Sequence, residues 1–525
     1  MQSRGDGRWT TVGNLDGATR WRVDPAGLVQ TEGAAWSLDW WIGAEDRWHV
    51  PAREAAVRQE LLGNAPVVVT RVKVPSGDAV QRVYAARDAA GQEALVVEIT
   101  NESTVPFAVA LAVRPYPVDG PGRVERIELA NSIVRVDGQA VLSLSRSPGR
   151  MAMSTGAGGD SAAMVFAGDA TAVAPSDTRC GQGLAQGALL FPLAHTATLR
   201  AVLLVAEAPV DFDALPDAEN VAKGWGLHTR VGARFEVPER RLREAVLSST
   251  RFLLLGPAGP IEAAALDLAG FAEDAGRALL HDPIHLVKRG GNALAALAAL
   301  GQHWALTRDA TFAKEATELV AALVPQLPKG AGEVPATVLL DAAGLLSDAG
   351  EDRAAKDMRA LAQQVGGPDG SRVDDLTERL ATASSTWTWP GVHGGHDLAA
   401  HAALVTLVRA RLIQEVPGGL ALSPGIPEAW LGQGWEVHDA PTGSGRLSYA
   451  IRWHGERPAL LWELDPHDGL GPVRLTTPTI DAAWFSTERS GEALLAPVPV
   501  PDRPARSRGL SIPVVIEPMS RREPE

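Results

Sequence analysis

The residues best suited to chemistry gather in one short stretch, "SSTWTWPGVHGGHDLAAHAA" (384–403). If a helix begins near His396, Asp397 and His401 lie four positions apart on one face, and His393 could approach from the preceding loop. These three groups would suit a catalytic zinc, but their spacing matches no standard zinc motif. The simpler interpretation places Asp397 in the first helical turn, accepting a hydrogen bond from His401. We therefore predict no metal site and no cofactor.

A second pair of acidic residues occurs in "LDLAGFAEDAGRALLHD", where Glu273 and Asp274 are adjacent. Neighbouring residues on a helix point about 100° apart, so these two carboxylates cannot flank one bond as acid and base. One of them could act with a distant acid such as Asp397. The alternative is that both belong to a solvated helix face.

Composition excludes several classes of function. The chain has 525 residues with 63 acidic and 49 basic side chains, a formal net charge of -14, so a nucleic-acid partner is not expected. Cys180 is the only cysteine, which excludes an internal disulfide and suits a reducing compartment. The first residues lack the apolar core of a signal peptide, and no stretch approaches the roughly 20 apolar residues of a membrane helix. We expect a soluble, cytoplasmic protein with no membrane partner.

Three zones follow one another along the chain. Period-two runs such as "APVVVTRVKVPSG" predict strands up to about residue 230, while three-to-four spacing predicts about eight helices between 238 and 414. One of these helices is expected at 261–280. Alternation returns in "GRLSYAIRWHG". The fold class is therefore β–α–β, and we place an N-terminal antiparallel β-sandwich at 1–232, an α/α-hairpin domain at 233–416 and a small C-terminal β-domain at 417–525.

Three stretches resemble the six-hairpin glycosidase superfamily, which includes glucoamylases, maltose phosphorylases and debranching-type enzymes. They are "GGNALAALAALGQHWALTRDATFAKEATELV" (290–320), "TWPGVHGGHDLAAHAALVTLVRARLIQE" (388–415) and "GGLALSPGIPEAWLGQGWEVHDAPTGSGRLSYAI" (418–451). The resemblance implies an N-terminal super-sandwich, an (α/α)6 toroid and a C-terminal β-domain. Because residues 238–415 are too few for twelve helices with functional loops, we expect an incomplete toroid of about four hairpins.

The resemblance also implies a carbohydrate site at the mouth of the helices. Inverting hydrolysis needs two carboxylates about 6.5–9.5 Å apart. The catalytic candidates are Asp397 with Glu273 or Asp274, but Gly391 stands where related enzymes commonly carry an acid. Aromatic faces and nearby imidazoles would bind the sugar. The candidates for substrate binding are Trp387, Trp389, His393, His396 and Trp304.

The tryptophan-rich stretch "WSLDWWIGAEDRWH" (36–49) has two interpretations. Bulky side chains on paired strands would fill the core of the sandwich. Alternatively, Trp40, Trp41 and Trp48 would form a carbohydrate-binding face.

These observations lead to three hypotheses. The first is a carbohydrate-active, six-hairpin-like protein with reduced or lost catalysis that binds an oligosaccharide or polysaccharide. The second is an active inverting glycoside hydrolase acting on α-glucan-like oligosaccharides. The third is a non-catalytic scaffold or assembly protein, with a homo-oligomer or a protein partner left open. The shortage of acids and aromatics in the helical zone favours the first and third.

Overall fold

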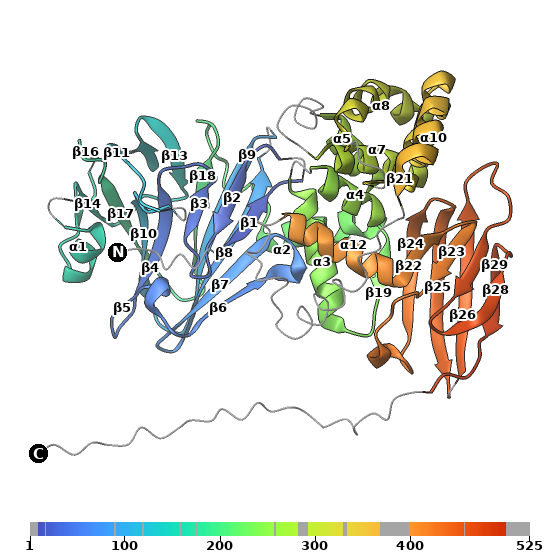
Figure 1. Cartoon of the computed structure of the whole chain (residues 1–525). Coiled ribbons are helices and arrows are strands. Elements are labelled where there is room, and N and C mark those ends of the chain that lie inside the picture. Colours follow the sequence, from blue (N-terminus) through green and yellow to red (C-terminus); the bar gives the residue numbers. More distant parts are fainter. Residues whose placement is uncertain are drawn as a thin grey trace, which may run out of the picture.

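The structure is a computed structural model that describes residues 9–15, 17–88, 91–117, 120–156, 159–174, 176–256, 259–281, 292–328, 333–367, 398–455 and 457–499; the side chains of 365–367 are not described. A β-sandwich, a group of helices and a smaller β-domain follow one another along the molecule (Figure 1). This arrangement confirms the predicted β–α–β fold class. The domain boundaries at 232/233 and 416/417 stay a prediction. None of the described helices combines the length and apolar character needed to cross a bilayer.

The N-terminal sandwich consists of two antiparallel sheets whose inner faces share one apolar core. The first sheet has the order β1-β2-β3-β4-β10-β17-β14-β15, with β5 paired to β4. Its strands are β1 (Thr10–Gly13), β2 (Arg20–Val23), β3 (Val29–Thr31), β4 (Ser37–Gly43), β5 (Trp48–His49), β10 (Phe107–Arg114), β14 (Arg150–Ser154), β15 (Thr171–Ala172) and β17 (Gln186–Leu193).

The second sheet has the order β16-β11-β12-β13-β18-β9-β8-β7-β6. Its strands are β6 (Val57–Leu61), β7 (Val67–Val74), β8 (Gly77–Arg87), β9 (Glu93–Ser103), β11 (Arg126–Ala130), β12 (Ile133–Val136), β13 (Gln139–Leu144), β16 (Ser176–Arg179) and β18 (Thr198–Leu204). Their outer apolar side chains pack toward the helices and join the helical core, which explains why strands such as β8 and β9 are buried on both faces.

The tryptophan-rich stretch fills cores on both sides of the first sheet. Trp40 and Trp41 are fully buried, and because successive strand residues point to opposite faces, Trp40 enters the sandwich core while Trp41 packs under helix α1 (Ser161–Ala167). The Trp41 indole also donates to Asp39 at 3.0 Å. The structural interpretation of Trp40 and Trp41 is therefore confirmed. The sequence did not predict α1, which is only two turns long.

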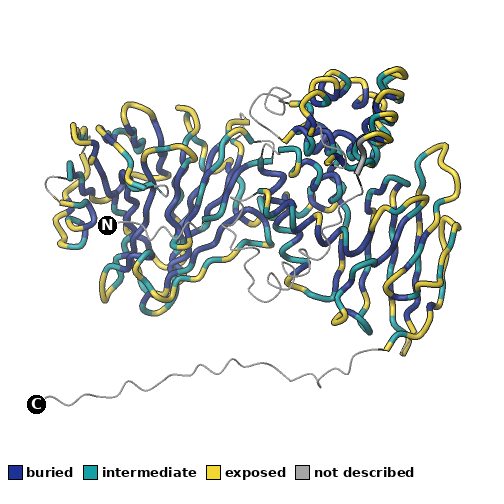
Figure 2. Tube along the Cα trace, viewed as in Figure 1, coloured by how far each residue is buried: buried dark blue, intermediate teal, exposed yellow. Residues whose placement is uncertain are grey.

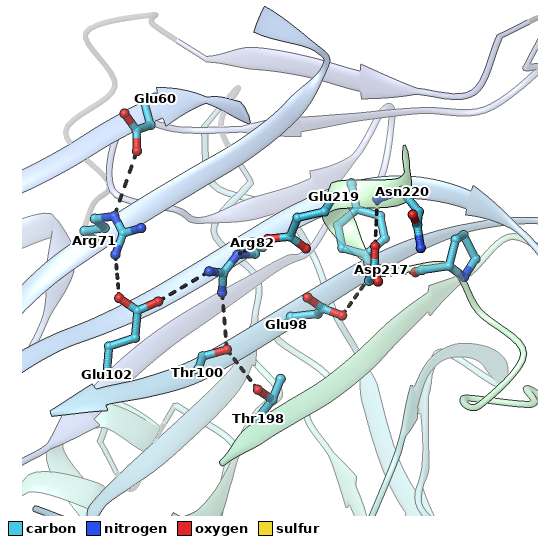
Figure 3. Close-up of polar contacts among 12 residues, drawn as sticks. Glu60, Arg71, Arg82, Glu98, Thr100, Glu102, Thr198, Asp217, Glu219 and Asn220 are labelled. Atoms are coloured by element: carbon cyan, nitrogen blue, oxygen red, sulfur yellow. Dashed lines mark hydrogen bonds and ion pairs between the residues drawn. The ribbon is translucent and has the colours of Figure 1, made fainter. Parts of the chain in front are cut away.

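A polar network holds the linker after the sandwich against the second sheet (Figure 3). The Tyr84 hydroxyl donates to Glu98 at 2.8 Å and lies 3.0 Å from the Pro216 carbonyl, while Asp217 caps helix α2 (Ala218–His228) by accepting from the Asn220 amide. Burial in this position raises the pKa of Tyr84 well above its usual range. The segment before α2, a second helix that the sequence did not predict, is thus held to the sheet by the partly buried contact between Tyr84 and the Pro216 carbonyl.

In the helical region consecutive helices pack against one another, and the last helix packs against the first two. Its helices are α3 (Arg240–Leu254), α4 (Pro260–Leu268), α5 (Ala272–His281), α7 (Ala293–Thr307), α8 (Ala310–Leu323), α9 (Ala336–Asp348), α10 (Asp352–Val365) and α12 (Leu398–Leu412). Helix α12 contacts α3 and α4 although it is far from them in sequence (Figure 1). A short parallel bridge joins β20 (Val334–Pro335) and β21 (Gly366–Gly367). Buried faces point inward, and the outer faces of α8 and α10 are exposed (Figure 2).

The single helix predicted at 261–280 is wrong, because the chain forms two helices, α4 and α5, across a turn at Gly270. Gly270 has a φ of +85°, which a helix interior does not allow and which favours glycine. Its amide donates to the Asp267 carbonyl at 2.9 Å. The break separates α5 from α4, so that the two helices pack against each other instead of continuing as one.

We expect Gly270→Ala to lower the free energy of unfolding by about 2 kcal/mol, because a Cβ would meet the Ala233 amide nitrogen at 2.6 Å and strain the left-handed backbone. Gly350→Ala is the matched control, since its φ is +89° but no atom lies within 4 Å of its Cβ position. It should cost about 1 kcal/mol, the backbone penalty alone. Equal losses in urea unfolding would contradict the close approach at Gly270.

The C-terminal part contains two sheets around a core that also includes residues of α3 and α12. One has the order β19-β24-β25-β26-β29, with bounds β19 (Arg234–Glu236), β24 (Trp435–Thr442), β25 (Gly445–His454), β26 (Arg457–Pro466) and β29 (Ser490–Leu494). The other has the order β22-β23-β27-β28, with bounds β22 (Ile413–Val416), β23 (Gly419–Leu422), β27 (Arg474–Thr477) and β28 (Asp481–Ser486). Strand β19 precedes α3 and yet pairs with β24, whereas β22, which follows α12, belongs to the other sheet. The chain therefore enters the helical region from one C-terminal sheet and leaves it into the other.

Candidate functional site

A cavity of about 410 Å³ lies where the first hairpin of the sandwich meets α3, α4 and α5. We call it the Asp274 cavity. Its apolar wall comes from leucines at the end of α3 and from Leu266 and Ala278. Its polar lining consists of Arg20, Asp274, Arg277 and His281. A carboxylate and several cationic or imidazole groups therefore stand beside an apolar surface.

The sandwich contributes a loop that is held in place by Glu93. The backbone amides of Ala18 and Thr19 donate to the Glu93 carboxylate at 3.1 and 3.0 Å. The Gly17 amide closes the turn on the Asn14 carbonyl at 3.0 Å. These bonds fix the backbone that leads into β2 and its first residue, Arg20.

Arg20 carries an uncommitted guanidinium into the cavity. Its side chain makes no hydrogen bond among the described residues, and its Nε is buried without a partner. Burial lowers the pKa of Arg20, which Glu32 opposes by its negative charge, and the group stays a cation at neutral pH. A Cβ on Gly256 would lie 3.1 Å from Arg20 Cζ, so glycine leaves room for the guanidinium. An oxygen-rich ligand would satisfy this group.

Helix α5 supplies the other polar groups from one face. Arg277 Nη1 lies 3.7 Å from Asp274 Oδ1, and 17% of the Asp274 side chain is exposed against 53% of Arg277. His281 completes the spacing of three and seven residues that aligns side chains along a helix. Glu273 is exposed and does not line the cavity, as the predicted 100° separation requires.

The start of α12 borders this cavity. Leu398 Cδ1 lies 3.2 Å from the Cβ position of Gly256. One turn later, the buried His401 lies within hydrogen-bond distance of Ser249, with Nδ1 to Oγ at 2.9 Å, and packs on the Phe252 ring at 5.0 Å. His401 is thus part of the contact between α12 and α3.

Five of the predicted site residues lie outside the described residues: Trp387, Trp389, His393, His396 and Asp397. Their roles stay predictions. In the part of the chain that the structure describes, no three His, Cys, Asp or Glu side chains are placed to hold a metal ion.

Trp304, the remaining predicted sugar platform, is a core residue with 6% of its surface exposed. Its indole donates to Asp348 at 2.8 Å, Arg308 covers its ring at 4.1 Å and Gly344 packs against it. Both the ring faces and the N–H group are therefore occupied by the protein. This placement does not support sugar stacking on Trp304.

Three residues of the cavity were not found by sequence reasoning: Arg20, Arg277 and His281. For Arg277 and His281 a signal exists, because they share a helix face with Asp274. Arg20 gives no such signal, since its approach to α5 depends on packing between segments some 250 positions apart.

The lining defines the chemistry that the cavity can support. Guanidinium groups and an imidazole bind hydroxyl, carboxylate or phosphate oxygens, and the Asp274 carboxylate accepts from hydroxyls or exchanges a proton. The leucine wall suits the C–H face of a ring. Among the described residues, Asp274 is the one carboxylate that lines the cavity.

Comparison with known proteins gave similarities in structure alone. No family model matches the chain, and no curated protein matches it in sequence. One similar solved structure is the "Putative kojibiose phosphorylase from human microbiome", with a TM-score of 0.44 and 6% identity over 92% of this chain and 95% of that one. Another is the family GH92 alpha-mannosidase from Bacteroides thetaiotaomicron, with a TM-score of 0.29 and 11% identity over 61% and 53%. No family follows from these values, and membership of the six-hairpin superfamily stays a prediction.

Proposed function

We propose that the protein is carbohydrate-active and binds an oligosaccharide in the Asp274 cavity, with reduced or lost hydrolytic catalysis. The observation that carries this proposal is the lining itself, in which Asp274, Arg20 and Arg277 stand beside a wall of leucines. A sugar ring presents the same combination, since its C–H face is apolar and its rim carries hydroxyls that both donate and accept. The resemblance of three sequence stretches to six-hairpin glycosidases supports the same substrate class.

The number of carboxylates argues for weak hydrolysis. Inversion needs an acid and a base on opposite sides of the glycosidic bond. Within the described lining, Asp274 supplies one of them and the exposed Glu273 does not supply the other. Asp397 remains the predicted partner. An active inverting hydrolase that uses Asp274 with Asp397 is therefore the first alternative.

The cationic groups favour a second candidate function, phosphorolysis. In that reaction a phosphate oxygen attacks the anomeric carbon and forms a C–O–P link. The glycosidic C–O bond breaks, and an acid gives its proton to the leaving oxygen. A single carboxylate is enough, because phosphate itself replaces the activated water. Arg20 and Arg277 would hold the phosphate charges, and Asp274 would be the acid.

One set of assays separates these functions. The purified chain is incubated with maltose, maltooligosaccharides and α-linked disaccharides, with and without inorganic phosphate, while binding is followed by calorimetry. Binding without product supports the proposed function, free sugar supports hydrolysis, and phosphate-dependent sugar 1-phosphate supports phosphorolysis. A protein that neither binds nor converts any of these glycans would instead fit the third hypothesis, a scaffold or assembly protein.

A further inference from the structure

A second cavity, of about 340 Å³, lies between the helical region and the C-terminal sheet. Its inner end is formed by Asp267 at the end of α4 and by Thr307 at the end of α7. Its rim is formed by Asp439 of β24, Arg446 of β25 and the segment that ends β26. We call it the Asp267 cavity. It shares no lining residue with the Asp274 cavity.

A buried carboxylate oxygen without a partner lies at the inner end. Asp267 is 1% exposed, and its Oδ1 lies 2.8 Å from His303 Nδ1. Its Oδ2 is buried and has no hydrogen-bond partner among the described residues. A buried acceptor in this state costs free energy unless a ligand or water bonds to it. The unused oxygen therefore points to a hydrogen-bond donor within the cavity.

The charged groups of the rim are also uncommitted. The side chains of Asp439, Asp465 and Arg446 are exposed, and in the described part of the chain they make no hydrogen bond or ion pair. Asp439 sits at a bulge of β24 with a φ of +54°, an uncommon conformation for a residue with a side chain. The cavity is thus lined by three carboxylates and one guanidinium, and among the described residues no hydrogen bond or ion pair joins the rim groups across it.

A third cavity, on the outer face of the second sandwich sheet, is lined by Arg82, Glu98 and Arg200 among others and offers a contrast. Figure 3 shows some of the polar contacts there, including those of Arg82. There Arg82 bonds to Thr100 and Glu102, and Arg200 bonds to Glu98 and to the Phe212 carbonyl. Because those charged groups already bond to protein partners, few of their donors and acceptors remain for a ligand. The Asp267 cavity has the opposite character.

We propose that the Asp267 cavity is a second binding site, which takes a single neutral sugar ring or a polyol of that size. Its volume is at the lower end of the range for small-molecule sites. Asp267, Asp439 and Asp465 would accept from ring hydroxyls, and Arg446 would donate to them. Three aspartates against one arginine disfavour phosphate and acidic sugars. The guanidinium of Arg446 disfavours a compact cation, and among the described residues no three His, Cys, Asp or Glu side chains are placed to hold a metal ion.

Hydrogen–deuterium exchange of the full chain tests this site separately from the Asp274 cavity. The probes are glucose, galactose, mannose and xylose, with glucosamine and glucuronate as charged comparisons. We expect a neutral sugar to protect peptides that cover 437–447 and 462–467. Asp439→Asn and Arg446→Gln, both on the exposed rim, should each raise the half-saturating concentration at least about tenfold. Asp267→Asn should do the same, and Asp468→Asn, an exposed neighbour outside the cavity, should change nothing.

Three outcomes would overturn the proposal. One is that no neutral sugar protects these peptides. Another is that protection survives both rim variants but disappears with Asp274→Asn, which would place the sugar in the Asp274 cavity. The third is that glucosamine or glucuronate protects them while the neutral sugars do not, which would assign a charged ligand. Because each cavity has its own peptides and variants, failure here leaves the function proposed for the Asp274 cavity untouched.

Discussion

Replacing Asp274 with asparagine is expected to weaken oligosaccharide binding by about 10- to 100-fold, the usual worth of a hydrogen bond to a charged group. The carboxylate lines the cavity, and its Oδ1 lies 3.7 Å from Arg277 Nη1, so in the proposed site it would accept from hydroxyls in a defined orientation. Asparagine keeps the size but removes the charge and replaces one acceptor with a donor. If the chain is catalytic, the product-forming rate should fall by about 10²- to 10⁴-fold as well.

The neighbouring residue provides a matched control for this prediction. Glu273→Gln removes the same charge from the same helical turn, but Glu273 is exposed outside the cavity and its loss should leave the Kd unchanged. Calorimetry with the best glycan of the panel measures both variants, and their thermal unfolding checks that the fold is intact. A larger loss of affinity in Glu273→Gln than in Asp274→Asn would place the site on the other face of α5.

The periodicity of the sequence was enough to predict the order of the three parts. Alternation reports which strand residues face a core, but it left open whether Trp40 and Trp41 fill the core or form a binding face. The structure buries both of them. Periodicity did not reveal the break between α4 and α5. Alanine and leucine continue across Gly270, and only the backbone conformation there shows that the helix ends. A lone glycine within a helical pattern is compatible with either outcome.

The candidate site was predictable only on the helix where its residues share a face. Asp274 was identified as one of a pair, and its spacing could have added Arg277 and His281. Arg20 reaches the cavity because the β1–β2 hairpin docks on α3, a long-range contact that no local pattern records. Trp304 was predicted to bind a sugar but is buried in the core. A single tryptophan on a helix gives the same sequence pattern whether its ring contacts a ligand or packs in the core.

The hydrogen bond between Asp267 and His303 could not be predicted from the sequence, because 36 positions separate the two residues and no local pattern links them. In the structure both side chains are almost fully enclosed, and the His303 ring also packs on Phe312 at 4.1 Å. Burial raises the pKa of Asp267 to about 6 from 3.8, although the hydrogen bond and charge of His303 act in the opposite direction. The effect of desolvation on the Asp267 pKa is therefore larger than the opposite effect of His303.

This shift predicts that the helical region loses stability as the pH rises from about 4 to about 6. Because the folded state holds the Asp267 proton more tightly than the unfolded state, its contribution is fully present below the unfolded pKa and is lost as pH rises through the folded one. Two pH units correspond to about 3 kcal/mol. Asp267→Asn stays neutral, so its free energy of unfolding relative to wild type should increase by about that amount between pH 4 and pH 7.

Native-state hydrogen exchange of peptides from α4 and α7 measures this difference where it arises, with His303 and the cavity groups Asp439, Asp465 and His467 unchanged in both proteins. Asp468→Asn, which replaces an exposed acid in the turn after β26, should track wild type at every pH. A constant difference between Asp267→Asn and wild type would mean that the carboxylate is as well solvated in the fold as in the unfolded chain. The opposite slope would mean that His303 stabilises the ionised carboxylate by more than burial costs, as in an ordinary buried ion pair.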